Sequence, residues 1–81
     1  MIKISLLFFG IATDLVGNSS LTITIPSNTS VQELRQLLTT KFPNLKQITS
    51  YAIAVNEEYA SKETILTAND TVAIIPPVSG G

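Results

Sequence analysis

Hydrophobic and polar residues alternate with a period of two in the first part of the chain. Apolar residues occupy every even position between 2 and 8, and Gly10 interrupts the run. Positions 20–25 alternate in the same way and stop at Pro26. Because successive side chains of a strand point to opposite faces, both segments are predicted to be strands. We expect them to form an antiparallel hairpin with a long turn.

A helix is predicted next, because the spacing of apolar residues changes to three and four. Ser30 can cap its first turn while Glu33, three residues later, reaches back in a capping box. Pro43 disfavours helical geometry at Phe42, so we expect the helix to end there. Its apolar face, which must lie on a sheet, comprises Val31, Leu34, Leu37, Leu38 and Phe42.

The rest of the chain predicts two further strands and a short extended piece. A loop after the helix leads to a strand at residues 51–55, which a turn at 56–58 separates from an extended piece near Tyr59. Residues 69–70, Asn-Asp, signal another turn. A β-branched strand at 71–75 follows.

This order of elements permits a mixed sheet with one main helix packed on one face. If the last strand lies parallel beside the first, the arrangement is the β-grasp, or ubiquitin-like, α+β fold, although other small α+β sheets share the order. We predict a β-grasp domain over residues 1–76. Residues 77–81 are expected to be a flexible, extended C-terminal tail.

Composition narrows the chemistry that the side chains could perform. The 81 residues include no Cys and no His, which excludes a disulfide framework, a thiolate nucleophile and a cysteine-ligated metal. Five basic and six acidic residues are scattered, which argues against nucleic acid as a partner. No apolar run is long enough for a membrane span, so a cytoplasmic protein is expected. An apolar fraction of 44% with 14% charge indicates a surface for a protein partner.

The C-terminal residues carry the most specific signal. Pro76 and Pro77 hold the backbone extended and project the residues beyond them away from the domain. Gly80 and Gly81 lack a Cβ, so they could enter a narrow channel of another protein. The terminal carboxylate is ionised at neutral pH and is a poor electrophile until activated. A mixed anhydride with AMP would let a sulfur nucleophile attack the carbonyl and leave a thiocarboxylate.

The ending IIPPVSGG at residues 74–81, preceded by NDTVA at 69–73, resembles that of the MoaD family, the small subunits of molybdopterin synthase. Residues 2–10, residues 54–56 and the total length also resemble this family. One departure is Asn69, where the family commonly has Gly in the turn. Asn can adopt the same left-handed conformation, so the fold is still expected.

The resemblance implies a non-catalytic, sulfur-donating subunit of a sulfurtransferase. An activating enzyme would adenylate Gly81 with ATP, and a sulfurtransferase would supply the sulfur of the thiocarboxylate. The large synthase subunit would hold the catalytic pocket and use the tail to convert cyclic pyranopterin monophosphate, within a heterotetramer. Two carriers would be consumed per molybdopterin, in molybdenum cofactor biosynthesis. No cofactor is expected to stay bound to the chain.

Strand parity predicts where partners dock. If the even positions of the first strand face the helix, Leu7 and Phe9 face the opposite side, and so does Ile75 on the last strand. Exposed apolar side chains that collect on one face mark an interaction site. The resemblance places the contacts to both partner proteins at Phe9, Tyr59, Ile75, Pro76, Pro77, Val78 and Ser79. Glu57 and Glu58, by contrast, are interpreted as a solvated turn.

Three alternatives use the same fold. Thiazole-pathway carriers share the terminal chemistry but are usually shorter and lack the Pro-Pro-Val-Ser spacer. A carrier for tRNA thiolation or a ubiquitin-like modifier would transfer the terminal glycine or its sulfur to another acceptor. A purely structural interaction module would not need the tail.

Overall fold

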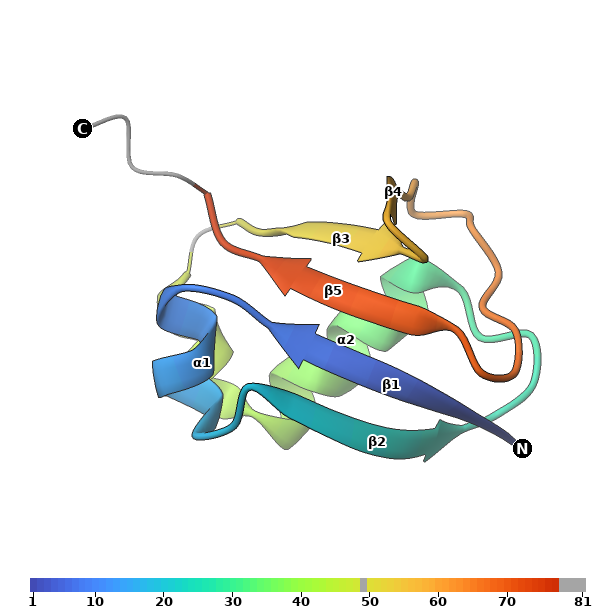
Figure 1. The fold of residues 1–81 in the computed structure, drawn as a ribbon, viewed down its shortest axis with the longest axis horizontal. Coiled ribbons are helices and arrows are strands. Elements are labelled where there is room, and N and C mark those ends of the chain that lie inside the picture. Colours follow the sequence, from blue (N-terminus) through green and yellow to red (C-terminus); the bar gives the residue numbers. More distant parts are fainter. Residues whose placement is uncertain (49, 78–81) are drawn as a thin grey trace.

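The computed structural model describes residues 1–48 and 50–77, which form one sheet and the helices that pack on it (Figure 1). The sequence-based predictions for Val78, Ser79, Gly80 and Gly81 concern residues outside these described ranges. In chain order the elements are β1 (Ile2–Phe8), α1 (Ile11–Val16), β2 (Ser20–Ile25), α2 (Val31–Lys41), the 3-10 helix η1 (Pro43–Gln47), β3 (Ala52–Val55), β4 (Glu58–Tyr59) and β5 (Thr71–Ile75).

The sheet is mixed, with the strand order β2-β1-β5-β3-β4. β1 and β2 form the predicted antiparallel hairpin, with Ile4 opposite Ile23. β5 lies beside β1 and parallel to it, with Leu6 opposite Val72. β3 is antiparallel to β5 and carries the short strand β4 on its outer side. The predicted β-grasp topology is therefore confirmed, and the two central strands are the first and the last.

The helix α2 covers one face of the sheet and passes behind the strands in Figure 1. Its start is the predicted capping box: the Glu33 backbone N–H donates to Ser30 Oγ at 3.2 Å, and the Ser30 N–H donates to Glu33 Oε1 at 3.0 Å. The bond from the Ser30 N–H lowers the pKa of the Glu33 carboxyl. The backbone N–H of Phe42 closes the last turn on the Leu38 carbonyl.

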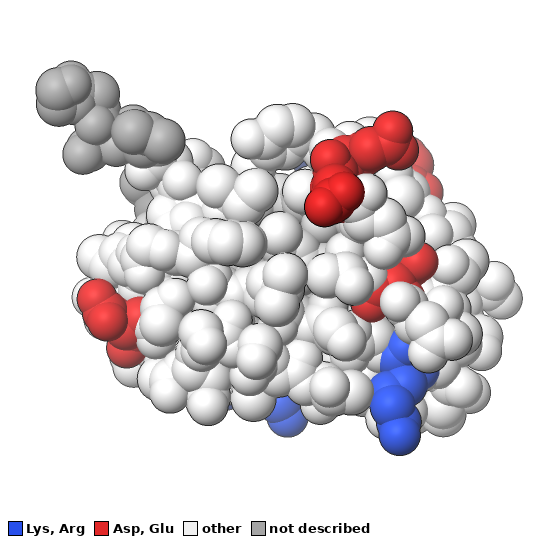
Figure 2. All heavy atoms as spheres, in the orientation of Figure 1, with Lys and Arg blue, Asp and Glu red and all other residues white. Residues whose placement is uncertain are grey.

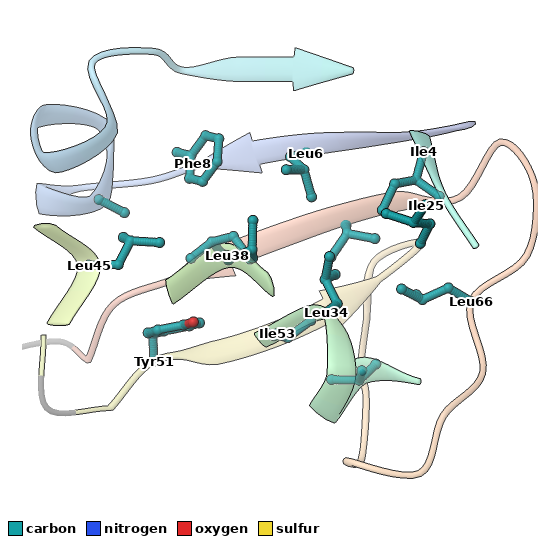
Figure 3. Packing of buried hydrophobic residues seen from close by; sticks show 14 residues of the cluster. Ile4, Leu6, Phe8, Ile25, Leu34, Leu38, Leu45, Tyr51, Ile53 and Leu66 are labelled. Carbon is teal, nitrogen blue, oxygen red and sulfur yellow. The ribbon is translucent and has the colours of Figure 1, made fainter. Parts of the chain in front are cut away.

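The core lies between α2 and the sheet (Figure 3). Ile4, Leu6 and Phe8 of β1 and Val72 and Ile74 of β5 point into it and are almost fully buried, as the alternation predicts, while Ile2 at the start of β1 is only partly buried. The ring of Phe8 meets that of Phe42 edge to face, with 6.0 Å between centroids. Among the most deeply buried side chains are Ile4, Leu6, Ile25, Leu34, Leu38, Leu45, Leu66, Val72 and Ile74.

Two connections differ from the sequence prediction. The turn between the first two strands contains the helix α1, which the sequence does not signal because it has six residues and no side-chain N-cap. Gly10, at φ 55° and ψ −135°, turns the chain out of β1, and Gly17, at φ 85°, ends the helix. The predicted loop after α2 contains η1, which buries Leu45.

β3 begins at Ala52, one residue later than the sequence predicts. None of the helices in the described ranges is long and apolar enough to cross a membrane.

Candidate functional site at the helix-free face and the C-terminal end

An apolar patch lies on the face of the sheet that α2 leaves uncovered. β1 and β5 are neighbours there, with Leu7 opposite Ala73. The chain leaves β1 at Phe9, whose backbone N–H donates to the Ile74 carbonyl at 3.2 Å, so Phe9 lies next to Ile75. Phe9 is 48% exposed. The parity prediction for these two strands is therefore correct.

The β3–β4 hairpin completes this patch. Asn56 and Glu57 both have positive φ, 51° and 73°, which gives the tight turn that places Tyr59 opposite Ala54. Tyr59 is 77% exposed, and no described loop covers it. A shallow hollow of about 330 Å³ opens between these strands. We call its apolar lining the apolar patch: Leu7, Phe9, Ala54, Tyr59, Ala73 and Ile75.

A second hollow, of about 410 Å³, continues the apolar patch toward the C-terminal end. Tyr59 and Ile75 line both hollows. Pro76 and Pro77 line the second hollow, where the chain leaves β5. The structure thus brings together the five described residues of the predicted partner surface. Sequence reasoning missed the other lining residues, Ser50, Tyr51 and Ala52.

Charged groups are sparse on this face. Figure 2 shows its centre, over β1 and β5, without acidic or basic side chains, while acidic side chains gather beside β4. Glu57 and Glu58 belong to that group, and both are exposed on the hairpin turn. No group of three or more metal-ligating acidic side chains occurs among the residues described. The surface therefore suits the burial of apolar area against a protein, with the terminal carboxylate of the chain nearby in sequence.

A hydrogen-bond network around the buried Asp70 carboxylate holds the start of β5 in place. The Asp70 carboxylate accepts hydrogen bonds from the backbone N–H of Thr67 at 2.8 Å and from Asn56 Nδ2 at 2.9 Å. The Thr67 hydroxyl donates to it at 3.0 Å, and Asn56 Oδ1 accepts from the backbone N–H of Thr71 at 2.9 Å. Asn69, at φ 70°, adopts the predicted left-handed turn. The network joins the hairpin turn to β5 and fixes the register in which Ile75 reaches the patch.

Replacing Asp70 by Ala should lower the free energy of unfolding by roughly 2–3 kcal/mol at pH 7, because three donors lose a charged acceptor. Burial alone would raise the pKa of the Asp70 carboxyl, but the bonds from Thr67 and Asn56 outweigh it and lower the pKa. A carboxyl whose pKa is lower in the folded state than in the unfolded state stabilises the fold at pH values above its unfolded-state pKa. This contribution to the free energy of unfolding is lost as the pH falls through the folded-state pKa. Urea unfolding should therefore show a difference between variant and parent that shrinks below about pH 4.

Asp14→Ala is the matched control for this substitution, because Asp14 is exposed and lies outside the network. It should leave the unfolding free energy within roughly 0.5 kcal/mol of the parent. An Asp70→Ala variant as stable as the control at pH 7 would contradict the role of the network.

Tyr51 supports the second hollow from beneath. The Arg35 guanidinium lies over its ring, 4.6 Å from the centroid, and Arg35 Nη1 donates to the Tyr51 carbonyl at 2.9 Å. The Tyr51 side chain is buried, and its hydroxyl has no hydrogen-bond partner among the described residues. An unsatisfied buried hydroxyl destabilises a fold.

Tyr51→Phe should therefore raise the free energy of unfolding by about 1 kcal/mol, since the ring and its contact with Arg35 remain. Thermal unfolding with Tyr59→Phe as the control measures this directly, because Tyr59 is exposed and its hydroxyl remains hydrated. A clear loss of stability in Tyr51→Phe alone would show that the hydroxyl has a partner in solution.

The chain is similar in sequence and fold to known proteins. The family model described as "ThiS family" matches residues 6–81. The molybdopterin synthase sulfur carrier subunit of Arabidopsis thaliana is 40% identical over 81 residues, which cover 99% of this chain and 84% of the relative.

Solved structures share the fold. The small archaeal modifier protein 1 from Methanosarcina acetivorans superposes with a TM-score of 0.82 at 26% identity, over 100% of this chain and 98% of that one. A chain from the complex of subunits 1 and 2 of the molybdopterin-converting factor of Helicobacter pylori superposes with a TM-score of 0.71 at 27% identity. That match covers 99% of this chain and 100% of the other.

Proposed function

This chain belongs to the ThiS family, among the sulfur carrier subunits of molybdopterin synthase, and we propose that the carboxylate of Gly81 is the group that carries the sulfur. It is a sulfur carrier subunit of molybdopterin synthase, in the biosynthesis of the molybdenum cofactor. The observation that carries this conclusion is the likeness to such a carrier over almost the whole chain. The apolar patch that leads to Pro76 and Pro77 supports it.

Activation of the terminal carboxylate is the first chemical step of the proposal. A carboxylate oxygen of Gly81 attacks the α-phosphorus of ATP on an activating enzyme, and pyrophosphate leaves. A sulfurtransferase then supplies sulfur at the oxidation level of sulfide, which attacks the acyl carbon. AMP departs with one former carboxylate oxygen, and a thiocarboxylate remains. ATP is consumed on the activating enzyme, and this chain keeps no cofactor of its own.

Transfer of the sulfur takes place on the large subunit. The thiocarboxylate sulfur is a nucleophile that attacks cyclic pyranopterin monophosphate in a pocket of the large subunit, which gives a thioester with the Gly81 acyl carbon. Water then cleaves the bond between the acyl carbon and the sulfur, so that the sulfur stays on the product and the Gly81 carboxylate is regenerated. Molybdopterin holds two dithiolene sulfurs, so two carriers are consumed per product, which fits a heterotetramer. A large-subunit partner is supported by the solved complex of the Helicobacter pylori proteins.

The apolar patch docks both partner proteins. Phe9 and Tyr59 are large, exposed and close to Ile75, and such side chains dominate the energy of interfaces. Because one surface serves the activating enzyme and the large subunit, the carrier binds them in turn. Pro76 and Pro77 then restrict the backbone where the chain leaves the patch, which favours entry of Gly81 into a pocket of the docked partner.

A single-turnover reconstitution tests this function. Thiocarboxylated carrier, large subunit and cyclic pyranopterin monophosphate are mixed, and molybdopterin and the intact mass of the carrier are followed together. We expect two carriers to return to the carboxylate form for each molybdopterin formed. Product formed with unmodified carrier, or thiocarboxylate left unconsumed while product accumulates, would contradict the proposal.

A role as a protein modifier is the second candidate, because the solved small archaeal modifier protein 1 shares the fold. In that role the Gly81 carboxyl would form an isopeptide bond with a lysine amine. Mass spectrometry of the proteins bound to a tagged chain would show Gly81 attached to lysine side chains. The sulfur-carrier role predicts no such conjugates.

A further inference from the structure

The two edge strands of the sheet differ in how well they are protected against pairing with a strand of another chain. The edge strand β4 has two residues, of which Glu58 is acidic, and the acidic Glu57 precedes it. The other edge strand, β2, has six residues, and none of them is charged or proline. No other described segment pairs with its outer side, and in Figure 1 it is the outermost strand. Proteins usually block such an edge, because its backbone groups can pair with another strand.

The backbone pairing with β1 shows which groups of β2 are free. The Phe8 N–H donates to the carbonyl of Ser19 at 2.9 Å. In an antiparallel pair, hydrogen-bonded residues alternate, so Leu21 and Ile23 also direct their backbone groups toward β1. Ser20, Thr22 and Thr24 therefore direct theirs outward.

A groove runs along this edge between β2 and α2. Its volume is about 750 Å³, and Ile23 and Leu37 on its floor are only half-buried. Glu33 and Lys41 line it from α2. They lie eight residues apart along the helix, or about 12 Å, so opposite charges mark its two ends.

We propose that β2 is a self-association edge, at which a second copy of this chain adds its own β2 in antiparallel orientation about a two-fold axis at Thr22. In this register Thr22 pairs with Thr22 of the second copy, and Ser20 pairs with Thr24. These are the three residues whose backbone groups face outward. In this register the N–H and C=O groups of all three form hydrogen bonds with the second copy. On the helix side, Leu21 of one copy lies opposite Ile23 of the other and both become more buried.

Charge complementarity favours a second copy of this chain over an arbitrary peptide as the partner of β2. A two-fold axis perpendicular to the sheet reverses the direction of α2, so the Glu33 end of one groove faces the Lys41 end of the other. No like charges oppose one another along the strands, because β2 has none. Hydroxyl-bearing Ser and Thr side chains meet on the opposite face of the sheet.

The association is compatible with partner docking. Both helix-free faces lie on the same side of the joined sheet, and β2, which carries no residue of the apolar patch, separates the patch of each copy from the axis. The buried area is smaller than that of stable interfaces, so the dissociation constant should be on the order of 0.1–1 mM.

Cysteine cross-linking tests both the edge and its register, since the natural chain has no Cys. Thr22→Cys places two cysteines opposite each other across the axis, about 5.5 Å apart at Cα, within disulfide range. Thr24→Cys is the matched control on the same strand and face, with the Cα atoms of its two copies roughly 14–15 Å apart. We expect a covalent dimer from Thr22→Cys and none from Thr24→Cys under mild oxidation. Equal cross-linking of both, or none of Thr22→Cys, would overturn the proposal.

Sedimentation equilibrium supplies an independent test on a chain without cysteine. Lys41→Glu should weaken self-association about 5- to 10-fold, because it places two carboxylates at each end of the joined groove. Lys62→Glu makes the same charge change on an exposed residue outside the groove and should leave the association unchanged. A parent chain that stays monomeric at about 2 mM would overturn the proposal, as would equal effects of the two substitutions.

Discussion

Deletion of Gly81 should abolish measurable molybdopterin formation. The rate should fall by a factor on the order of 1,000 or more relative to the full chain. The deletion leaves Gly80 as a terminal carboxylate of the same chemistry, but moves it back by roughly 3.5 Å. Positioning of a reacting group at that scale controls catalysis, because a misplacement of about 1 Å can lower a rate by about 100-fold. Product is measured with the large subunit, the activating enzyme, ATP and a sulfur source.

The deletion has a clear internal control. Gly81 lies six residues beyond Ile75, the last residue of β5, so the thermal unfolding temperature and the affinity for the large subunit should change little. A truncated chain that keeps more than about a tenth of the activity would show that the terminal position is not the reactive one.

A charge placed in the apolar patch should have the second largest effect. Phe9→Asp removes a large, half-exposed aromatic side chain and leaves a carboxylate that docking must desolvate. We expect the affinity for the large subunit to fall by at least about 100-fold, and binding to the activating enzyme to fall similarly. Titration calorimetry with each purified partner measures both effects.

Thr24→Asp is the matched control, because it adds the same charge to an exposed residue of β2, two strands away from β5. It should change the affinity for the large subunit less than about 3-fold. If both variants are folded and lose equal affinity for the large subunit, the docking surface lies elsewhere.

Local patterns predicted the parts of this fold that depend on neighbouring residues. The capping box at Ser30 and Glu33 is a contact between residues three apart, and the alternation of β1 reports the two faces of one strand. The order of elements permits the parallel pairing of β5 with β1 but also permits other small α+β sheets, and the structure shows which of them forms.

Features that depend on distant residues could not be predicted in the same way. α1 has too few residues for a periodic signal, and it is held by packing of Ala12 into the core and by a bond from Thr13 Oγ1 to the Phe8 carbonyl. The bond between Asn56 and Asp70 joins residues 14 positions apart. Each residue alone indicates only a turn.

In the candidate site, too, local patterns predicted some features, while others depend on distant residues. The alternation of side chains along a strand predicted that Phe9 and Ile75 lie on one face. That prediction requires only the period of a strand and the pairing of β1 with β5. The second hollow depends on how Ser50 and Tyr51 enter β3, which no local pattern specifies. The partner roles of Phe9, Tyr59, Ile75, Pro76 and Pro77 stay predictions.

The sulfur-carrier chemistry of Gly81 is tested by the intact mass of the untagged chain after incubation with its activating enzyme, ATP and a sulfur source. We expect a mass increase equal to the replacement of one oxygen by one sulfur, located at Gly81 by fragmentation and absent from the chain without Gly81. An unchanged mass, with an activating enzyme that modifies a known carrier in the same assay, would contradict the sulfur-carrier function of the C-terminus.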